Sequence, residues 1–265
     1  MGSPLFVRRW GQGPPVLFVH GLGASSRYWK PLAQVSSGYA ATAPDLLGFG
    51  HSPTPPDASY DVDSHLEALV PLLPPGAVVV GHSMGAILAA ALAAACPVRA
   101  LLLLGLPAFP DRASARRDIG GLGLLARLTV DGSPLARWLC QAMCAVRPLA
   151  STVAPLVNRD LPRSIASDGA RHTWASYHRS LERVVIEHRV LPDLVAAGAP
   201  AVLVHGRLDR AAPLNRARAL AHEARGAGVA TQLEVVSGDH HLALRCPEAV
   251  AAALADLVAK ADHDP

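Results

Sequence analysis

The chain has 265 residues, of which 51% are hydrophobic and 17% are charged, and its formal net charge is +3. This composition is typical of a globular protein and excludes a disordered one, and the length is sufficient for one large domain with a buried core. The small net charge, and the lack of any Lys/Arg-rich run interleaved with aromatic residues, exclude a nucleic-acid-binding protein.

The N-terminal region does not resemble a secretory signal, because Arg8 and Arg9 stand where its apolar core would be. The longest apolar stretch near a helix, residues 86–96, is shorter than the roughly 20 residues that span a bilayer. We therefore expect no membrane insertion and a cytoplasmic location. Arginine supplies 22 of the 24 basic residues, and this bias, together with the many alanines, indicates a high-GC bacterial genome.

The four cysteines also fit a cytoplasmic protein; they are Cys96, Cys140, Cys144 and Cys246. Cys140 and Cys144 are one helical turn apart, but no second pair has the spacing of a zinc site. We expect buried thiols and no metal.

Predicted strands and helices alternate along the chain. Short apolar runs predict strands over residues 5–9, 16–20, 39–43, 77–80, 100–104, 201–205 and 232–236. The segments between them predict helices over residues 28–34, 62–73, 86–95, 216–224 and 247–261. The alternation predicts an α/β fold with a mostly parallel sheet and helices on both of its faces.

One segment, residues 107–189, interrupts this alternation. It has no strand candidate, and its helical stretches are separated by Gly and Pro. We therefore expect an α/β core formed by residues 1–106 and 190–265, with residues 107–189 inserted as a helical cap.

A candidate nucleophile, Ser83, lies in the run Gly-His-Ser-Met-Gly at residues 81–85. This run matches the pattern Gly-x-Ser-x-Gly, with a predicted strand directly before it and a predicted helix directly after it. A serine hydroxyl at such a turn is lifted out at the end of the strand, next to the positive end of a helix dipole. Glycine on either side removes the steric clashes that the turn would otherwise create.

Residues 20–25, His-Gly-Leu-Gly-Ala-Ser, follow another predicted strand. A turn of this kind aims backbone N–H groups at the oxyanion that forms during acyl transfer. We expect the donors to be the N–H groups of Leu22 and of Met84, the residue after the nucleophile.

A serine nucleophile also needs a base and an acid that orients the base. Asp209 follows the predicted strand over residues 201–205, whereas the end of the strand over residues 100–104 has no carboxylate. The base is expected after the last strand, where the loop contains His240 and His241. The order Ser, Asp, His is that of known hydrolases, but position alone does not choose between the two histidines.

These residues resemble the α/β-hydrolase superfamily, in particular its small esterase-like members with a helical cap. The resemblance rests on residues 20–23, on the run Asp-Leu-Leu-Gly-Phe-Gly-His-Ser at 45–52, on the Ser83 motif, and on the Asp209 and His240 loops. In this superfamily the catalytic histidine commonly precedes a proline by seven residues, so Pro247 implies His240. The residue before it is Asp239 where the superfamily usually has glycine, which keeps His241 as the second choice.

The resemblance also implies that Trp29 packs near the oxyanion turn and contacts the substrate. The cap would cover the pocket, with candidate lining residues that we expect to serve mainly in helix packing: Trp138, Met143, Trp174, Tyr177 and His178.

The predicted function is hydrolysis of a small-molecule carboxylic ester through an acyl-enzyme, with neither cofactor nor metal. Cleavage of a carbon–carbon bond, a lactone or a thioester would use the same triad. A ligand receptor or a non-hydrolytic natural-product enzyme on the same fold is an alternative of a different class. The sequence carries no signal for an oligomeric state.

Overall fold

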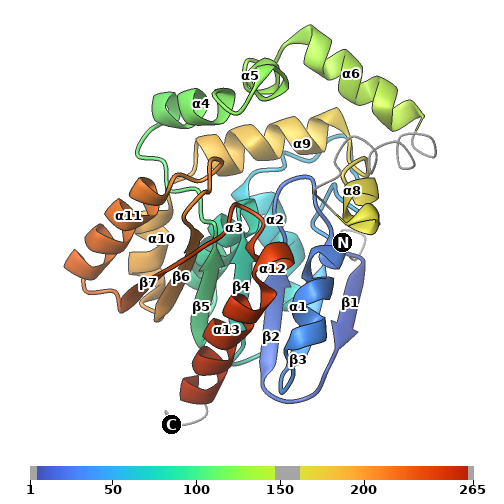
Figure 1. Ribbon diagram of the computed structural model, residues 1–265. Helices are drawn as coiled ribbons and strands as arrows, with labels where there is room; N and C mark the ends of the chain where they lie inside the picture. The colour runs from blue at the N-terminus through green and yellow to red at the C-terminus, as the bar shows by residue number, and fades with distance from the viewer. Residues whose placement is uncertain (1–4, 147–161, 262–265) are drawn as a thin grey trace.

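A seven-stranded sheet forms the centre of the computed structural model, which describes residues 5–146 and 162–261 (Figure 1). The strands are β1 (Val7–Trp10), β2 (Pro15–Val19), β3 (Ala40–Pro44), β4 (Val78–His82), β5 (Ala100–Leu104), β6 (Ala201–Gly206) and β7 (Thr231–Val236). Their order is β1-β3-β2-β4-β5-β6-β7, and every neighbouring pair is parallel except β1 with β3. The predicted mostly parallel α/β sheet is confirmed.

Two apolar cores lie on the two faces of the sheet, because successive side chains of a strand point to opposite faces. In β2, Val16 and Phe18 belong to one core, and Leu17 and Val19 belong to the other. The first core is covered by η1 (Ser26–Trp29), α1 (Lys30–Val35), α12 (Leu242–Arg245) and α13 (Pro247–Ala261). The second is covered by α2 (Val62–Leu69), η2 (Val70–Leu72), α3 (Met84–Ala95), α10 (Val190–Ala197) and α11 (Leu214–Gly226).

Helix α3 is the most deeply buried helix in this second layer. Ten consecutive residues from Met84 to Ala93 are buried, and most of them are alanine or another small residue. Alanine has the highest intrinsic helix propensity and lets neighbouring backbones approach closely. Its sequence therefore suits a helix that is enclosed by the sheet, by α2 and by α10.

Every helix or strand that the structure describes between β5 and β6 is a helix, and loops connect them. The helices are α4 (Arg112–Gly120), α5 (Leu124–Val130), α6 (Pro134–Ala145), α8 (Arg163–Asp168), α9 (Trp174–Ser180) and the π-helical segment η3 (Leu181–Ile186), followed by α10. In Figure 1, α4, α5, α6 and α9 lie beyond the carboxyl ends of the parallel strands. Within the described residues, no helix is both long enough and apolar enough to span a membrane.

Candidate active site

Ser83 occupies a tight turn between the end of β4 and the start of α3. Its backbone has φ = 54° and ψ = −122°, a strained conformation that residues other than glycine rarely adopt. The Ser83 N–H donates a hydrogen bond to the Leu104 carbonyl oxygen (2.9 Å). A Cβ at Gly81 would collide with the backbone of Gly85 and Ala86, so glycine is required for the strand and the helix to pack this closely. The half-buried Ser83 side chain stands at the carboxyl end of the sheet.

His240 connects Ser83 to Asp209. Its Nε2 atom lies 2.9 Å from the Ser83 Oγ, and its Nδ1 atom lies 2.8 Å from the Asp209 Oδ2. The three residues follow β4, β6 and β7, and these strands, together with β5, are consecutive in the sheet. Because parallel strands end at one edge, residues that are far apart in the sequence meet there.

Asp209 is held in place by its own loop. Its Oδ1 accepts hydrogen bonds from the N–H groups of Ala211 (2.9 Å) and Ala212 (2.8 Å), which leaves Oδ2 for His240. The carboxylate is almost completely buried. The loop is also tied to the His240 loop, since the Leu208 N–H donates to the Gly238 carbonyl oxygen (2.9 Å).

Other histidines surround His240 and have lowered pKa values. The His82 side chain donates from Nε2 to the His240 carbonyl oxygen (2.8 Å). Burial lowers the pKa of His82 well below its ordinary value, and the neighbouring His240 lowers it further. Burial likewise lowers the pKa of His205 and of His241. These neighbours therefore favour the neutral form, because burial penalises their charge.

His241 lies beside the Ser83–His240–Asp209 chain but is not part of it. Its ring lies 5.8 Å from His240, 6.2 Å from His82 and 6.5 Å from Tyr28, measured between ring centroids. Its N–H donates to the Asp239 Oδ1 (2.9 Å), and the residue caps the short helix α12. His241 makes no hydrogen bond with Ser83 or Asp209 in the described structure, so the two adjacent histidines have different environments.

The turn that follows β2 lies directly beside Ser83. His20 is fully buried and accepts at Nε2 from the Leu46 N–H (2.9 Å), so Nδ1 carries the proton and donates to the Gly21 carbonyl oxygen (2.8 Å). A Cβ at Gly21 would lie 3.1 Å from the Ser83 Cβ. The Leu22 and Met84 N–H groups donate to none of the described residues. Burial lowers the pKa of His20, which favours the neutral form of that side chain.

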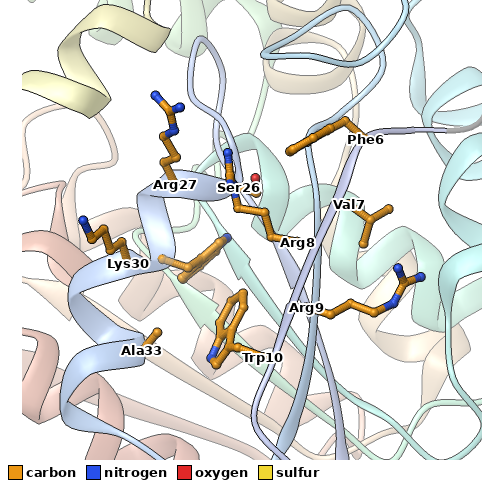
Figure 2. A pocket seen from close by; sticks show the side chains of 10 residues that line it. Phe6, Val7, Arg8, Arg9, Trp10, Ser26, Arg27, Lys30 and Ala33 are labelled. Carbon is orange, nitrogen blue, oxygen red and sulfur yellow. The ribbon is translucent and has the colours of Figure 1, made fainter.

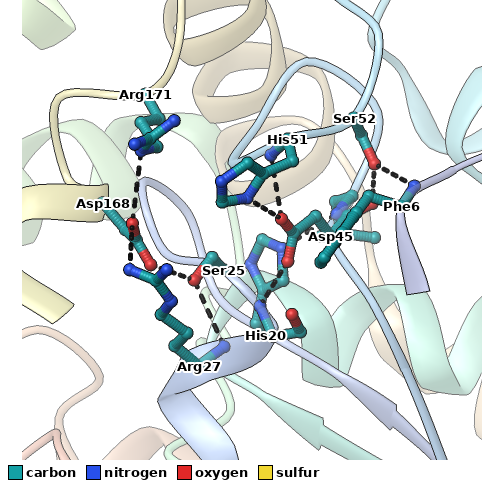
Figure 3. Close-up of polar contacts among 11 residues, drawn as sticks. Phe6, His20, Ser25, Arg27, Asp45, His51, Ser52, Asp168 and Arg171 are labelled. Atoms are coloured by element: carbon teal, nitrogen blue, oxygen red, sulfur yellow. Dashed lines mark hydrogen bonds and ion pairs between the residues drawn. The ribbon is translucent and has the colours of Figure 1, made fainter. Parts of the chain in front are cut away.

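Two buried carboxylates anchor the segments around this turn (Figure 3). Asp45 accepts from the N–H groups of Ser26 (2.7 Å) and His51 (2.9 Å). Burial raises the pKa of Asp45, but hydrogen bonds from Ser26 and His51 outweigh burial, so the net pKa is lowered.

The second carboxylate, Asp168, connects α8 to η1. It accepts from the Ser25 hydroxyl (2.6 Å) and forms ion pairs with Arg27 (3.3 Å) and Arg171 (3.4 Å). The helical segment between β5 and β6 is thereby attached to the segment that follows the turn beside Ser83.

The other residues singled out in the sequence lie in varied surroundings. Trp29 is fully buried against Phe18 and Tyr28 rather than facing Ser83. Tyr177 approaches the turn, since a Cβ at Gly23 would lie 3.2 Å from its ring. Trp174 stacks on His178, whereas 63% of Trp138 is exposed.

The four cysteines are half-buried, whereas full burial was expected. Cys140 lies 3.6 Å from the His172 Nε2, and Cys144 donates to the His172 carbonyl oxygen. In the part of the chain that the structure describes, no three His, Cys, Asp or Glu side chains are arranged to hold a metal ion.

The structure adds two residues near the site that the sequence analysis did not single out, His82 and Gly105. His82 stands inside the Gly-x-Ser-x-Gly run, where its contact with the His240 backbone has no sequence signal. Gly105 follows β5 and has φ = 54°. Its position directly after a predicted central strand is the sequence feature that could have identified it.

Comparisons with known proteins identify a matching family and similar sequences and folds. The profile of the "Alpha/beta hydrolase family" matches residues 16–253. The Arabidopsis thaliana protein named "Probable lysophospholipase BODYGUARD 5" is 28% identical over 259 residues, which cover 85% of this chain and 57% of that protein. The pimeloyl-[acyl-carrier protein] methyl ester esterase of Aeromonas salmonicida is 32% identical over 105 residues, covering 39% of this chain and 41% of the esterase.

The chain spans about half the length of the curated relatives it matches over most of its own sequence. Among solved structures, an esterase from Exiguobacterium antarcticum superposes with a TM-score of 0.71 at 19% identity, covering 98% of this chain and 100% of the esterase. This likeness shows a shared fold.

Proposed function

Because the chain belongs to the alpha/beta hydrolase family, we propose that it is a serine hydrolase that cleaves a carboxylic ester through Ser83, His240 and Asp209. The observation that carries the proposal is the unbroken hydrogen-bonded chain from the Ser83 Oγ through the His240 ring to the buried Asp209 carboxylate. Such a chain is what a serine needs to act as a nucleophile.

In the proposed reaction, the His240 Nε2 takes the Ser83 proton while the Ser83 Oγ attacks the ester carbonyl carbon. The tetrahedral intermediate then collapses, and His240 gives the proton to the departing alcohol, leaving Ser83 acylated. Water loses a proton to His240 and attacks the acyl-enzyme, and the proton returns to Ser83 as the acid leaves.

The oxyanion of each tetrahedral intermediate would be bound by the N–H groups of Leu22 and Met84. Two observations support this assignment: the turn containing Leu22 lies against Ser83, and neither N–H donates to another described residue. Removal of one such donor typically costs about 3 kcal/mol of transition-state stabilisation.

The charge that His240 gains during the reaction is stabilised by the buried Asp209 carboxylate, which lies 2.8 Å from its Nδ1. The neighbouring His82, His205 and His241 have pKa values lowered by burial. They therefore do not add a second positive charge that would oppose protonation of His240.

An ester is the proposed substrate class because the chain is related to an esterase and to a protein named as a lysophospholipase. We also assign residues 107–189 as the cap over the acyl pocket. This assignment is supported by Tyr177 of α9, which approaches Gly23, and by Ser176, whose hydroxyl donates to the Gly48 carbonyl oxygen (2.9 Å).

The test uses release of nitrophenol from acetyl, butyryl and octanoyl esters. We expect Ser83→Ala to lower kcat by about a thousandfold or more, with an unchanged circular dichroism spectrum. Ser37→Ala, at an exposed serine far from the site, is the matched control and should retain full activity.

A fluorophosphonate probe supplies the second readout, because it reacts only with an activated serine. It should label the parent chain and the Ser37→Ala variant but not Ser83→Ala. If the parent chain neither takes the label nor hydrolyses any of the esters, the proposal is wrong. A thioester and a lactone are included in the same panel, and hydrolysis of either one in place of the esters would indicate a different acyl substrate.

A further inference from the structure

We propose that the cavity between β1 and the η1–α1 segment is a second binding site, for a small organic anion that has a flat apolar body. The cavity has a volume of about 740 Å³, within the range of small-molecule sites. Its lining residues come from the edge strand and from the helical segment that faces it (Figure 2): Phe6, Val7, Arg8, Arg9, Trp10, Ser26, Arg27, Trp29, Lys30 and Ala33.

The lining residues that belong to β1 point alternately to its two faces. In Figure 2, Arg8 and Trp10 extend from the strand toward η1 and α1, whereas Val7 and Arg9 extend to the opposite side. This alternation is that of any strand. It places one guanidinium and one indole opposite Lys30 and the buried Trp29.

Four buried polar atoms of the lining residues have no hydrogen-bond partner among the described residues: the Ser26 Oγ and three nitrogen donors. The Arg8 Nε, the Trp10 Nε1 and the Trp29 Nε1 atoms are buried, and none has a hydrogen-bond partner among the described residues. All three carry an N–H group and none can accept a hydrogen bond. A buried donor without a partner is costly, so the cavity is suited to a ligand that supplies acceptor oxygens.

The charge of the lining residues also favours a ligand that supplies acceptor oxygens. Arg8 and Lys30 form no ion pair with a described residue, and no Asp or Glu is among the lining residues that the structure describes. Arg27 differs, because it pairs with Asp168 (3.3 Å). A carboxylate or a phosphate would therefore meet two unpaired cations, and charge-assisted hydrogen bonds are the strong ones.

The aromatic side chains indicate the body of the ligand. Trp10 stacks on Phe18 at a centroid distance of 5.4 Å, and the Arg8 guanidinium lies 5.0 Å from the centre of the Phe6 ring. Opposite them the helical wall presents Ala33, whose side chain occupies little space. An aromatic or other flat apolar group would be accommodated between these surfaces.

This site is separate from the Ser83 site. None of its lining residues belongs to the Ser83–His240–Asp209 chain. Tyr28 lies between the two regions, since its ring contacts Trp29 on one side and stacks on His82 on the other. The second site therefore does not depend on the proposed hydrolase activity.

Isothermal titration calorimetry of the full chain with phenyl phosphate and with benzoate tests the proposal. We expect saturable binding of at least one of these anions, and binding of neutral phenol weaker by about tenfold or more. The titration is repeated after Ser83 has been treated with a fluorophosphonate, and the affinity should be unchanged. Binding that the treatment abolishes would assign the anion to the Ser83 site and overturn the proposal.

Variants locate the binding. Arg8→Gln and Lys30→Gln should each weaken binding of the preferred anion by about tenfold, and Trp10→Phe, which keeps an aromatic ring but removes the N–H, should weaken it by less. Arg218→Gln, at an exposed arginine on α11, removes the same charge elsewhere and should bind like the parent chain. The proposal is overturned if neither anion binds saturably, or if Arg218→Gln loses as much affinity as the cavity variants that fold.

Discussion

Gly105 brings the backbone against the hydrogen bond between His240 and Asp209. A Cβ at this position would lie 3.2 Å from both the His240 Nδ1 and the Asp209 Oδ2, so one of the two side chains would have to shift. We expect Gly105→Ala to lower kcat for nitrophenyl esters by about tenfold to a hundredfold, because displacements of about 1 Å have effects of this size.

The control for this prediction is Gly198→Ala. Gly198 also has a positive φ, +59°, but a Cβ there would have no atom within 4 Å. Both variants carry the same left-handed strain, about 1 kcal/mol or somewhat more, and only Gly105→Ala should lose activity. An equal fall in kcat in both would show that strain, not contact with His240, is the cause.

His240 and His241 are adjacent in the sequence but make different contacts, and their substitution should have different effects. We expect His240→Ala to lower kcat by several powers of ten, because the Ser83 proton then has no acceptor. His241→Ala should change kcat by less than about tenfold, since His241 packs beside His82 and His240 but makes no hydrogen bond with Ser83 or Asp209 in the described structure. Steady-state kinetics on one ester measures both, and the reverse order would make His241 the base.

The sequence could locate candidate site residues where a strand end determines a position. Ser83 follows β4 directly and Asp209 lies in the loop after β6, and parallel strands bring these ends to one edge of the sheet. The orientation of a ring has no such signal, which is why His240 was separated from His241 only through the spacing to Pro247. Trp29 was expected at the turn beside Ser83, but its ring packs into the core with Phe18.

Among the elements, α8 and η1 are connected through a single buried carboxylate, Asp168. It is 1% exposed and interacts with Ser25, Arg27 and Arg171. We expect Asp168→Ala to lower the free energy of unfolding by about 2 kcal/mol, since it removes charge-assisted hydrogen bonds and leaves buried donors without an acceptor. Urea denaturation measures the change.

Asp131→Ala is the matched control for this prediction. Asp131 also pairs with an arginine, Arg127, but at 3.9 Å and with both side chains mostly exposed. Exposed pairs contribute little, so its loss should cost less than about 0.5 kcal/mol. Equal free energies of unfolding for the two variants would show that Asp168 does not stabilise the connection between α8 and η1.

Sequence patterns located the strands and the longer helices well, and missed short elements. The predicted helix over residues 247–261 coincides with α13, and the predicted strand over residues 100–104 coincides with β5. Helices α10 and α12 were missed because each is too short to show a helical period, and α10 also contains Pro192 in its first turn. The antiparallel direction of β1 depends on its pairing with β3, which a local pattern does not report.

For the whole molecule, buried histidines predict how stability depends on pH. Burial lowers the pKa of His65 to about 4, and also lowers the pKa of His20, His82, His205 and His241. Below the ordinary histidine pKa, near 6.5, the unfolded chain binds protons that the folded chain does not. The free energy of unfolding should therefore be highest above that pH and fall as the pH decreases toward 4.

His65 offers a direct check of this prediction. It belongs to α2, and its buried ring forms a hydrogen bond with the Ser180 hydroxyl of α9. His65→Gln can still form a hydrogen bond but cannot take up a proton. It should reduce the slope of the free energy of unfolding between pH 6 and 4.5 by about 1.4 kcal/mol per pH unit. His222→Gln, at an exposed histidine on α11, should leave the slope unchanged, and equal slopes for all three chains would contradict the prediction.

The chain leaves the sheet at the end of β5 and returns in β6, the strand paired directly beside it, with Leu101 opposite Ala201. The exit and the re-entry are therefore fixed by the sheet itself, whatever lies between them. Doubling the length of such an excursion costs only about 0.6 kcal/mol of closure entropy. The excursion between β5 and β6 can therefore change in length at little entropic cost, provided that α10, which packs on α3 and covers one face of the sheet, is retained.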